Sequence, residues 1–375
     1  KGLPVAYIAF EFYLAFKRKQ QLSRGISDQE KAASDEGVLK DRMSDALATL
    51  KAASKKADFL YELPWYVLIG PPGSGKTTAL VNSGLKFPLA SGTTPAAIAA
   101  VGGTRYCDWW FTEDAVLIDT AGRYTTQDSD AKADKQSWLA FLDLLKRNRP
   151  RQPINGVMVA ISLEDIMTLS KDEIAAHADA IRSRLIELHE RLGVDFPVYA
   201  LFTKADLVSG FVEFFDFLNE DGRRQVWGAT FQTDDKKLNL VGEIPAEFDS
   251  LLERITGRQI DRLQDEPAPD MRVTLFGFPA QMARLRQHLF AFINQIFDPR
   301  RYTADAPLRG FYFTSGTQQG TPIDQLIGSL AASFGSQISA SDYSGRGRSY
   351  FLTDLVQKVI IGESAWVLTD PQTVR

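Results

Sequence analysis

The sequence has few of the residues that form cross-links or coordinate metal ions. One cysteine, Cys107, and three histidines occur among 375 residues. A single thiol excludes an internal disulfide, and so few cysteines and histidines leave a zinc site without its usual ligands. The low cysteine count fits a reducing compartment. We therefore interpret the histidines as structural or surface residues.

The chain also lacks a strong excess of charge and a run of apolar residues as long as a membrane span. Its 43 basic and 47 acidic residues give a net charge of −4, so nucleic acid is not an expected partner. Residues 3–16 are apolar except for Glu11, and three basic residues follow them. This run is shorter than the roughly 20 residues of a full span. It predicts either the cytoplasmic end of a span or an amphipathic helix packed on the domain.

Short apolar runs alternate with helix-like segments from residue 60 onward. The pattern predicts strands at 65–69, 107–112, 115–118, 156–161, 197–202, 273–276 and 311–313, and helices at 77–83, 138–146, 171–192, 211–218 and 281–297. Continuous apolar strands alternating with helices favour an α/β fold with a mostly parallel sheet covered on both faces.

The same pattern suggests how the chain is organised. Residues 1–19 are assigned to the end of a membrane span or a membrane-proximal helix, and 20–59 to a helical linker. Residues 60–325 are assigned to one α/β domain with a polar insertion near 231–270, and the segment GPPGSGKT at 70–77 indicates that it is a P-loop NTPase domain of small-GTPase type. Residues 326–375 are assigned to a C-terminal helical extension.

A phosphate-binding loop is the strongest functional signal. The segment GPPGSGKT, residues 70–77, matches the pattern G-x-x-x-x-G-K-[ST] and lies between a predicted strand and a predicted helix. Glycines in such a loop let backbone N–H groups face the phosphates, the lysine reaches the β- and γ-phosphates, and the hydroxyl binds Mg²⁺. The predicted nucleotide contacts are Gly70, Gly73, Ser74, Gly75, Lys76, Thr77 and Thr78, with Lys76 also counted as catalytic and Thr77 as a metal ligand.

A second element follows the predicted strand at 115–118. Its sequence, Asp119-Thr-Ala-Gly122, has the form D-x-x-G. We expect Asp119 to hold Mg²⁺ through water and the Gly122 N–H to contact the γ-phosphate. Motor-type ATPases place a glutamate beside this aspartate, whereas this chain has Thr120, which favours a GTPase-like site.

A third element follows the predicted strand at 197–202. Thr203-Lys204-Ala205-Asp206 resembles the [NT]-K-x-D base-recognition loop of GTPases. Asp206 could accept hydrogen bonds from guanine N1 and N2, and Lys204 could lie over the ring. Ser315 is the candidate for a small-residue loop that closes over the base. The ligand is GTP or ATP with Mg²⁺.

Two further positions have open interpretations. Thr104 could complete the Mg²⁺ coordination, although Thr93 and Thr94 compete for that role. Arg123 stands where many regulatory GTPases place a water-orienting glutamine. It could stabilise transition-state charge, or it could be an ordinary surface arginine. Since no other general base is visible, hydrolysis is expected to be slow or dependent on a partner.

Several phrases together resemble one family. They are LYELPWYVLIGPPGSGKTTALVNSGLKFPLA, CDWWFTEDAVLIDTAGRYTTQDSD, FTKADLVSGFVEFF, VWGATF and LRGFYFTSGTQQGTPID. They resemble the cytoplasmic region of the TssM (IcmF-like) inner-membrane subunits of bacterial type VI secretion systems. The resemblance implies a position between the second and third spans, on the cytoplasmic face of the inner membrane.

The resemblance also implies partners. These are a second inner-membrane subunit, an outer-membrane lipoprotein and the baseplate, within an oligomeric complex. Some family members bind or hydrolyse ATP, and others lack an intact P-loop and still work. Two functions therefore stay open: an NTPase whose turnover energises assembly or secretion, and a non-catalytic scaffold in which nucleotide is structural or dispensable.

Overall fold

The computed structural model describes residues 35–52, 58–87, 107–125, 131–231, 240–301, 306–316 and 348–364. The predictions for residues 1–19 lie outside these ranges, as do those for Thr93, Thr94 and Thr104. Within the described residues, no helix is both long and apolar enough to cross a membrane.

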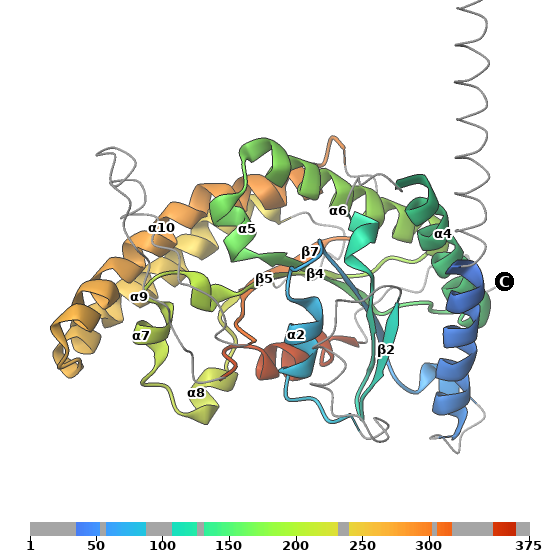
Figure 1. The fold of residues 1–375 in the computed structure, drawn as a ribbon, viewed down its shortest axis with the longest axis horizontal. Coiled ribbons are helices and arrows are strands. Elements are labelled where there is room, and N and C mark those ends of the chain that lie inside the picture. The colour runs from blue at the N-terminus through green and yellow to red at the C-terminus, as the bar shows by residue number, and fades with distance from the viewer. Residues whose placement is uncertain are drawn as a thin grey trace, which may run out of the picture.

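The described residues form a seven-stranded sheet with the order β2-β3-β1-β4-β5-β7-β6 (Figure 1). The strands are β1 (Trp65–Ile69), β2 (Asp108–Phe111), β3 (Val116–Asp119), β4 (Gly156–Ser162), β5 (Val198–Thr203), β6 (Gly228–Thr230) and β7 (Leu308–Phe313). The five central strands are parallel, and each edge strand is antiparallel to its neighbour. All residues of the five central strands are buried, which confirms the predicted parallel sheet with two covered faces.

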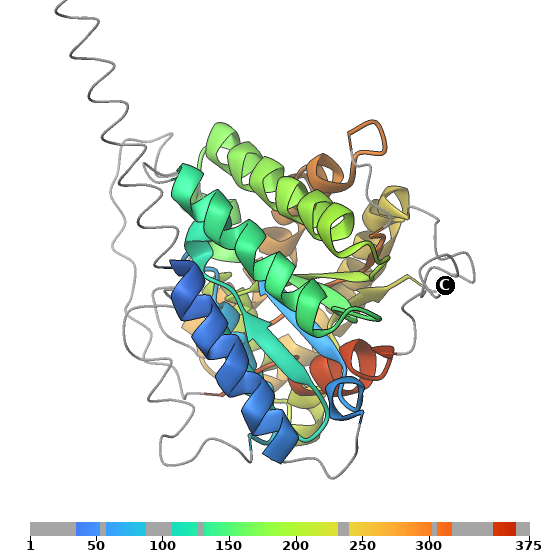
Figure 2. The same cartoon turned by 90° about the vertical axis from the view of Figure 1, so that its right-hand side faces the viewer.

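Helices cover one face of this sheet in a continuous layer. This layer contains the helix of residues 35–52, α4 (Ala131–Asn148), α6 (Lys171–Leu192), α9 (Ile244–Asp265) and α10 (Pro269–Phe297), and Figures 1 and 2 show them on the same side. Three shorter helices lie in the connections between these elements. They are α5 (Leu163–Thr168), between β4 and α6, and α7 (Phe211–Phe215) and α8 (Glu220–Arg224), between β5 and β6. α6 begins with a capping box of Ser170 and Glu173 and ends at Gly193, so its predicted bounds are confirmed.

The other face of the sheet packs on α2 (Lys76–Val81) and a π-helix at Leu355–Ile360. The Tyr66 hydroxyl donates a hydrogen bond to the Ile360 carbonyl at 2.6 Å, and Leu355 is fully buried. Arg309 on β7 forms an ion pair with Glu363 at 2.8 Å. Residues 348–364, which lie in the predicted C-terminal extension, therefore pack against the sheet.

Two predicted elements differ from the structure. Residues 273–276, predicted as a strand, form part of the 29-residue helix α10, in which Leu275 and Phe278 are buried and Phe276 is exposed. The polar stretch predicted as an insertion contains α9, whose Phe248, Leu251 and Ile255 enter the core. The short edge strand β6 was not predicted.

The described part of the predicted linker is a helix packed against the domain. Leu39, Met43 and Leu50 of the 35–52 helix are buried in the main core. Asp35, the first described residue of this helix, accepts hydrogen bonds from Arg123 at 2.9 Å and from Ser137 at 3.0 Å. A buried carboxylate therefore joins this helix to the rest of the domain.

Replacing Asp35 with alanine should destabilise the protein by about 1–3 kcal/mol, because it removes a buried charged acceptor. Glu36→Ala is the matched control. Glu36 pairs with Lys40 on the surface, with side chains 45% and 51% exposed, and such pairs contribute about 0–1 kcal/mol. Urea denaturation of both variants measures the difference, and equal losses would show that Asp35 does not hold the helix.

Candidate nucleotide-binding site

The phosphate loop begins where β1 ends, at the centre of the sheet. Strand order reverses here, since β3 lies on one side of β1 and β4 on the other. Ligands of open α/β sheets bind at the carboxyl ends of strands at such a switch point. At Gly70 an added Cβ would lie 2.1 Å from the Ala160 carbonyl oxygen on β4, so only glycine fits where the loop turns.

The ammonium group of Lys76 in the phosphate loop has hydrogen-bond partners within the protein. Lys76 is buried, and its Nζ donates to the carbonyls of Gly70 at 2.8 Å and Pro71 at 3.0 Å. Burial lowers the pKa of Lys76, while the attraction of Asp119 opposes that change. The Lys76 ammonium therefore lies at the head of the loop, as the motif predicts.

Thr77 and Asp119 meet as the motifs predict. The Thr77 hydroxyl donates a hydrogen bond to Asp119, which is fully buried at the end of β3. Thr120 fixes this segment by donating to the Leu68 carbonyl on β1 at 2.6 Å. A carboxylate and a hydroxyl side by side suit Mg²⁺, which takes oxygen ligands and keeps several waters.

Gly122 lies directly against the phosphate loop. A Cβ at this position would lie 2.5 Å from the Pro72 nitrogen, so a larger residue could not approach so closely. The close approach places the Gly122 backbone beside the loop, where its N–H was predicted to contact a γ-phosphate.

The guanidinium of Arg123 lies between two carboxylates. It contacts Asp134 at 2.8 Å and Asp35 at 2.9 Å, and its side chain is 23% exposed. The interpretation of Arg123 as an ordinary surface arginine is therefore wrong. Its role toward transition-state charge stays a prediction and would require the side chain to leave both carboxylates.

The predicted base loop is tied to the phosphate loop. The Thr203 hydroxyl donates to the Ser74 carbonyl at 2.6 Å and lies 3.2 Å from the Ile161 carbonyl on β4. Ala205 N–H donates to the Thr314 carbonyl at 3.0 Å, which adds the loop after β7. Three loops from separate strands thus meet at one edge of the sheet.

Asp206 lies in this base loop with one oxygen available. The residue is 4% exposed, and its Oδ1 is buried without a hydrogen-bond partner among the described residues. Burial raises the pKa of Asp206 to about 6, and a hydrogen bond with Ser315 opposes the rise. Ser315 is therefore beside Asp206, and it also pairs with Tyr350 through two backbone hydrogen bonds, while its closing over a base stays a prediction.

Lys204 adopts a left-handed backbone conformation, with φ of 56°. Its ammonium forms an ion pair with Glu164 at 2.8 Å. Sequence reasoning did not identify Glu164, whose position two residues after the Ser162 cap of α5 was the available signal. This ion pair fixes the direction of the lysine that was predicted to lie over a base.

The chain matches known proteins over most of its length. The model of the IcmF-related N-terminal domain matches residues 131–375. The type VI secretion system component TssM1 of Pseudomonas aeruginosa is 54% identical over 349 residues, which cover 92% of this chain and 32% of that protein. The chain thus spans about a third of the length of this curated relative.

Solved structures give weaker likenesses. The signal recognition particle receptor SRb-GTP/SRX complex from Chaetomium thermophilum is 20% identical with a TM-score of 0.27, over 40% of this chain and 76% of that one. The septin GTPase domain from Chlamydomonas reinhardtii is 14% identical with a TM-score of 0.30, over 81% and 92%. The sequence matches carry the assignment: the chain belongs to the IcmF-related (TssM) family of type VI secretion components.

Proposed function

We propose that this chain is a nucleotide-binding module of a type VI secretion membrane complex, at the cytoplasmic face of the inner membrane. In this proposal the module helps to anchor the secretion machine and contacts other membrane-complex and baseplate subunits in an oligomeric assembly. The observation that carries nucleotide binding is the meeting of three loops at one sheet edge, with Asp206 Oδ1 buried and unpartnered there among the described residues.

Different side chains at this edge would bind the phosphates, the Mg²⁺ ion and the base. Lys76 would bind the β- and γ-phosphates, and Thr77 and Asp119 would hold Mg²⁺, which neutralises phosphate charge when bound. Asp206 would accept two hydrogen bonds from guanine and would receive none from the corresponding edge of adenine. The site therefore favours GTP over ATP.

We further propose that intrinsic hydrolysis is slow. The residue after D-x-x-G is an arginine, and its guanidinium is paired with Asp35 and Asp134. Thr120, where motor ATPases have a glutamate, has its hydroxyl bonded to the Leu68 carbonyl. Neither side chain is arranged to activate water.

The alternative function is a non-catalytic scaffold, and one observation favours it. Lys76 has carbonyl acceptors within its own loop, and Thr77 bonds to Asp119, so the protein itself satisfies these polar groups. The fold then does not depend on nucleotide to stabilise the loop. Nucleotide turnover, measured with the purified chain, separates this function from an NTPase.

Lys76→Ala should weaken Mg·GTP binding at least about thirtyfold, because a hydrogen bond from a charged donor contributes about 2 kcal/mol or more. Lys86→Ala is the control, since the Lys86 side chain is 79% exposed and pairs only loosely with Glu113 at 3.6 Å. Isothermal titration calorimetry gives both affinities. An unchanged Kd in the Lys76 variant would contradict the phosphate-loop assignment.

Asp206→Asn should weaken GTP binding by about 2–4 kcal/mol, because the amide presents a donor to a base edge that also donates. The same change should let the protein bind XTP, whose C2 carbonyl accepts from that amide. The variant should stay folded at pH 7, because burial disfavours the charged carboxylate that it removes. Equal GTP affinity in parent and variant, with no gain for XTP, would refute base reading by Asp206.

The preference for GTP should depend on pH. Asp206, with a pKa of about 6, is mostly ionised at pH 7 and mostly protonated at pH 5, so one acceptor is lost as the pH falls. The ratio of GTP to ATP affinity should therefore drop about tenfold from pH 7 to pH 5. Because both nucleotides carry the same titrating phosphates, the ratio isolates Asp206. A ratio that stays constant across this range would argue against the carboxylate, and Asp206→Asn should show no such slope.

A further inference from the structure

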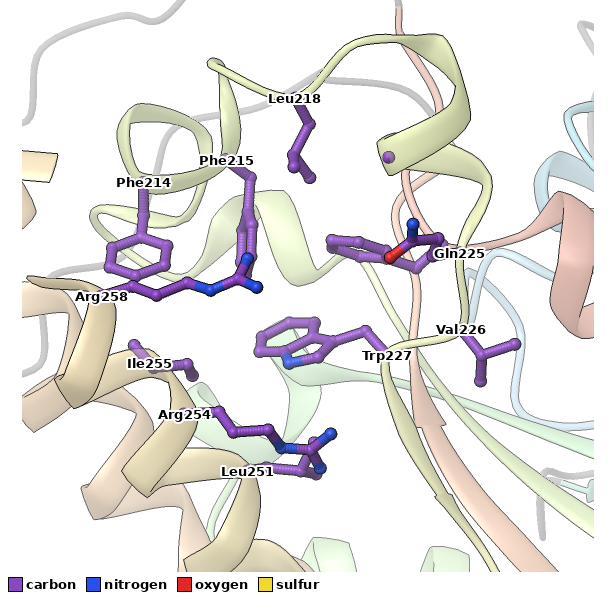
Figure 3. A pocket seen from close by; sticks show the side chains of 12 residues that line it. Phe214, Phe215, Leu218, Gln225, Val226, Trp227, Leu251, Arg254, Ile255 and Arg258 are labelled. Atoms are coloured by element: carbon purple, nitrogen blue, oxygen red, sulfur yellow. The ribbon is translucent and has the colours of Figure 1, made fainter. Parts of the chain in front are cut away.

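A groove separate from the nucleotide loops opens between α9 and the α7–α8 segment. Its volume is about 210 Å³, and Phe214, Phe215, Leu218, Trp227, Leu251 and Phe351 are among the side chains that line it (Figure 3). Small-molecule sites usually enclose roughly 300–1,000 Å³. The groove is therefore matched in size to one or two side chains.

The floor of the groove is a rigid aromatic cluster. The Trp227 ring lies 4.9 Å from that of Phe313 and 5.0 Å from that of Phe215. On the rim, Val226 is 37% exposed, although it is a large aliphatic residue. Aromatic side chains gathered at the centre of a concave patch are common in protein interfaces.

Two arginines flank the groove on the α9 side. Arg254 and Arg258 are exposed and one helical turn apart, and Figure 3 shows both extending from α9 toward the aromatic side chains. Neither forms an ion pair with a carboxylate in the described part of the chain, and the lining residues include no acidic side chain. Like charges at this spacing destabilise a helix slightly, so a negative partner would be favoured here.

We propose that this groove binds a short acidic peptide segment of a partner protein, which places one large apolar side chain in the groove, against Trp227 and Phe215. Arg254 and Arg258 would then pair with carboxylates on either side of that anchor. A peptide fits better than a membrane surface, because the apolar area is concave and only two cations accompany it. Arginine also recognises carboxylates with two parallel hydrogen bonds, which selects Asp or Glu flanks.

The test uses the full chain and a phage-displayed library of random 12-residue peptides. Peptides that bind are synthesised with a fluorescein label, and their affinities are measured by fluorescence polarisation. The variants are Arg258→Glu, Arg254→Glu and the double substitution, all on the exposed face of α9. Arg147→Glu on α4 is the control, because it makes the same charge change on an exposed residue away from the groove. GTP affinity and melting temperature report whether each variant keeps its fold.

The proposal expects the selected peptides to share an aromatic or leucine anchor with flanking Asp or Glu. Each arginine substitution should weaken them about tenfold, and Arg147→Glu should leave them unchanged. Peptides with Lys replacing the acidic residues should bind the double variant better than the parent. Neutral or basic peptides, or affinities insensitive to both arginines, would overturn the proposal.

Other occupants give distinct results. Binding to vesicles of phosphatidylserine and phosphatidylcholine that is lost in the double variant, without peptide binding, would identify a lipid surface instead. A dimer in sedimentation velocity that dissociates in the double variant would identify a second copy of the chain. Either result contradicts an acidic peptide as the occupant.

Discussion

The hydrogen bond from the Thr203 hydroxyl to the Ser74 carbonyl holds the candidate site together. β1 and β5 are not neighbours in the sheet, because β4 separates them, so the loops that follow them have no shared strand pairing. Thr203 closes this gap at 2.6 Å, and its second contact, with Ile161, reaches the intervening strand. The parallel register brings the loops to one edge, and this buried bond sets the distance between the phosphate and base ends.

Elements with a clear local pattern of apolar residues were predicted correctly from the sequence. Segments with a mixed pattern, whose structure depends on distant contacts, were not. The apolar runs of the central strands and the helical spacing of apolar residues within 171–192 are local patterns, so each predicts its element directly. Residues 273–276 mix apolar and polar side chains like a strand, yet the spacing of Leu275, Phe278 and later apolar residues is helical. Packing of that wider stripe against α6 and α9 overrides the local pattern.

In the candidate site, too, the short motifs could be predicted from the sequence and the long-range contacts could not. The phosphate loop and D-x-x-G are short motifs whose chemistry depends on neighbours in the sequence, and Thr77 and Asp119 meet as expected. The pairs Lys204–Glu164 and Arg123–Asp35 join residues 40 and 88 positions apart, and only the fold brings them together. The fold also brings Phe351, which lines the groove, close to the predicted base loop. Phe351 has a left-handed backbone conformation, and the residue before it, Tyr350, pairs with Ser315.

Two consecutive residues, Gly122 and Arg123, link the phosphate loop to the helix of residues 35–52. Gly122 touches Pro72 of the phosphate loop, and the next residue, Arg123, is paired with Asp35 of that helix. Because the two residues are consecutive, a shift of Gly122 strains the ion pair or carries the helix with it. A ligand changes such an arrangement only by the difference in its affinity for the two states. The ion pairs of Arg123 with Asp35 and Asp134 are therefore the contacts through which a movement at the phosphate loop would reach this helix.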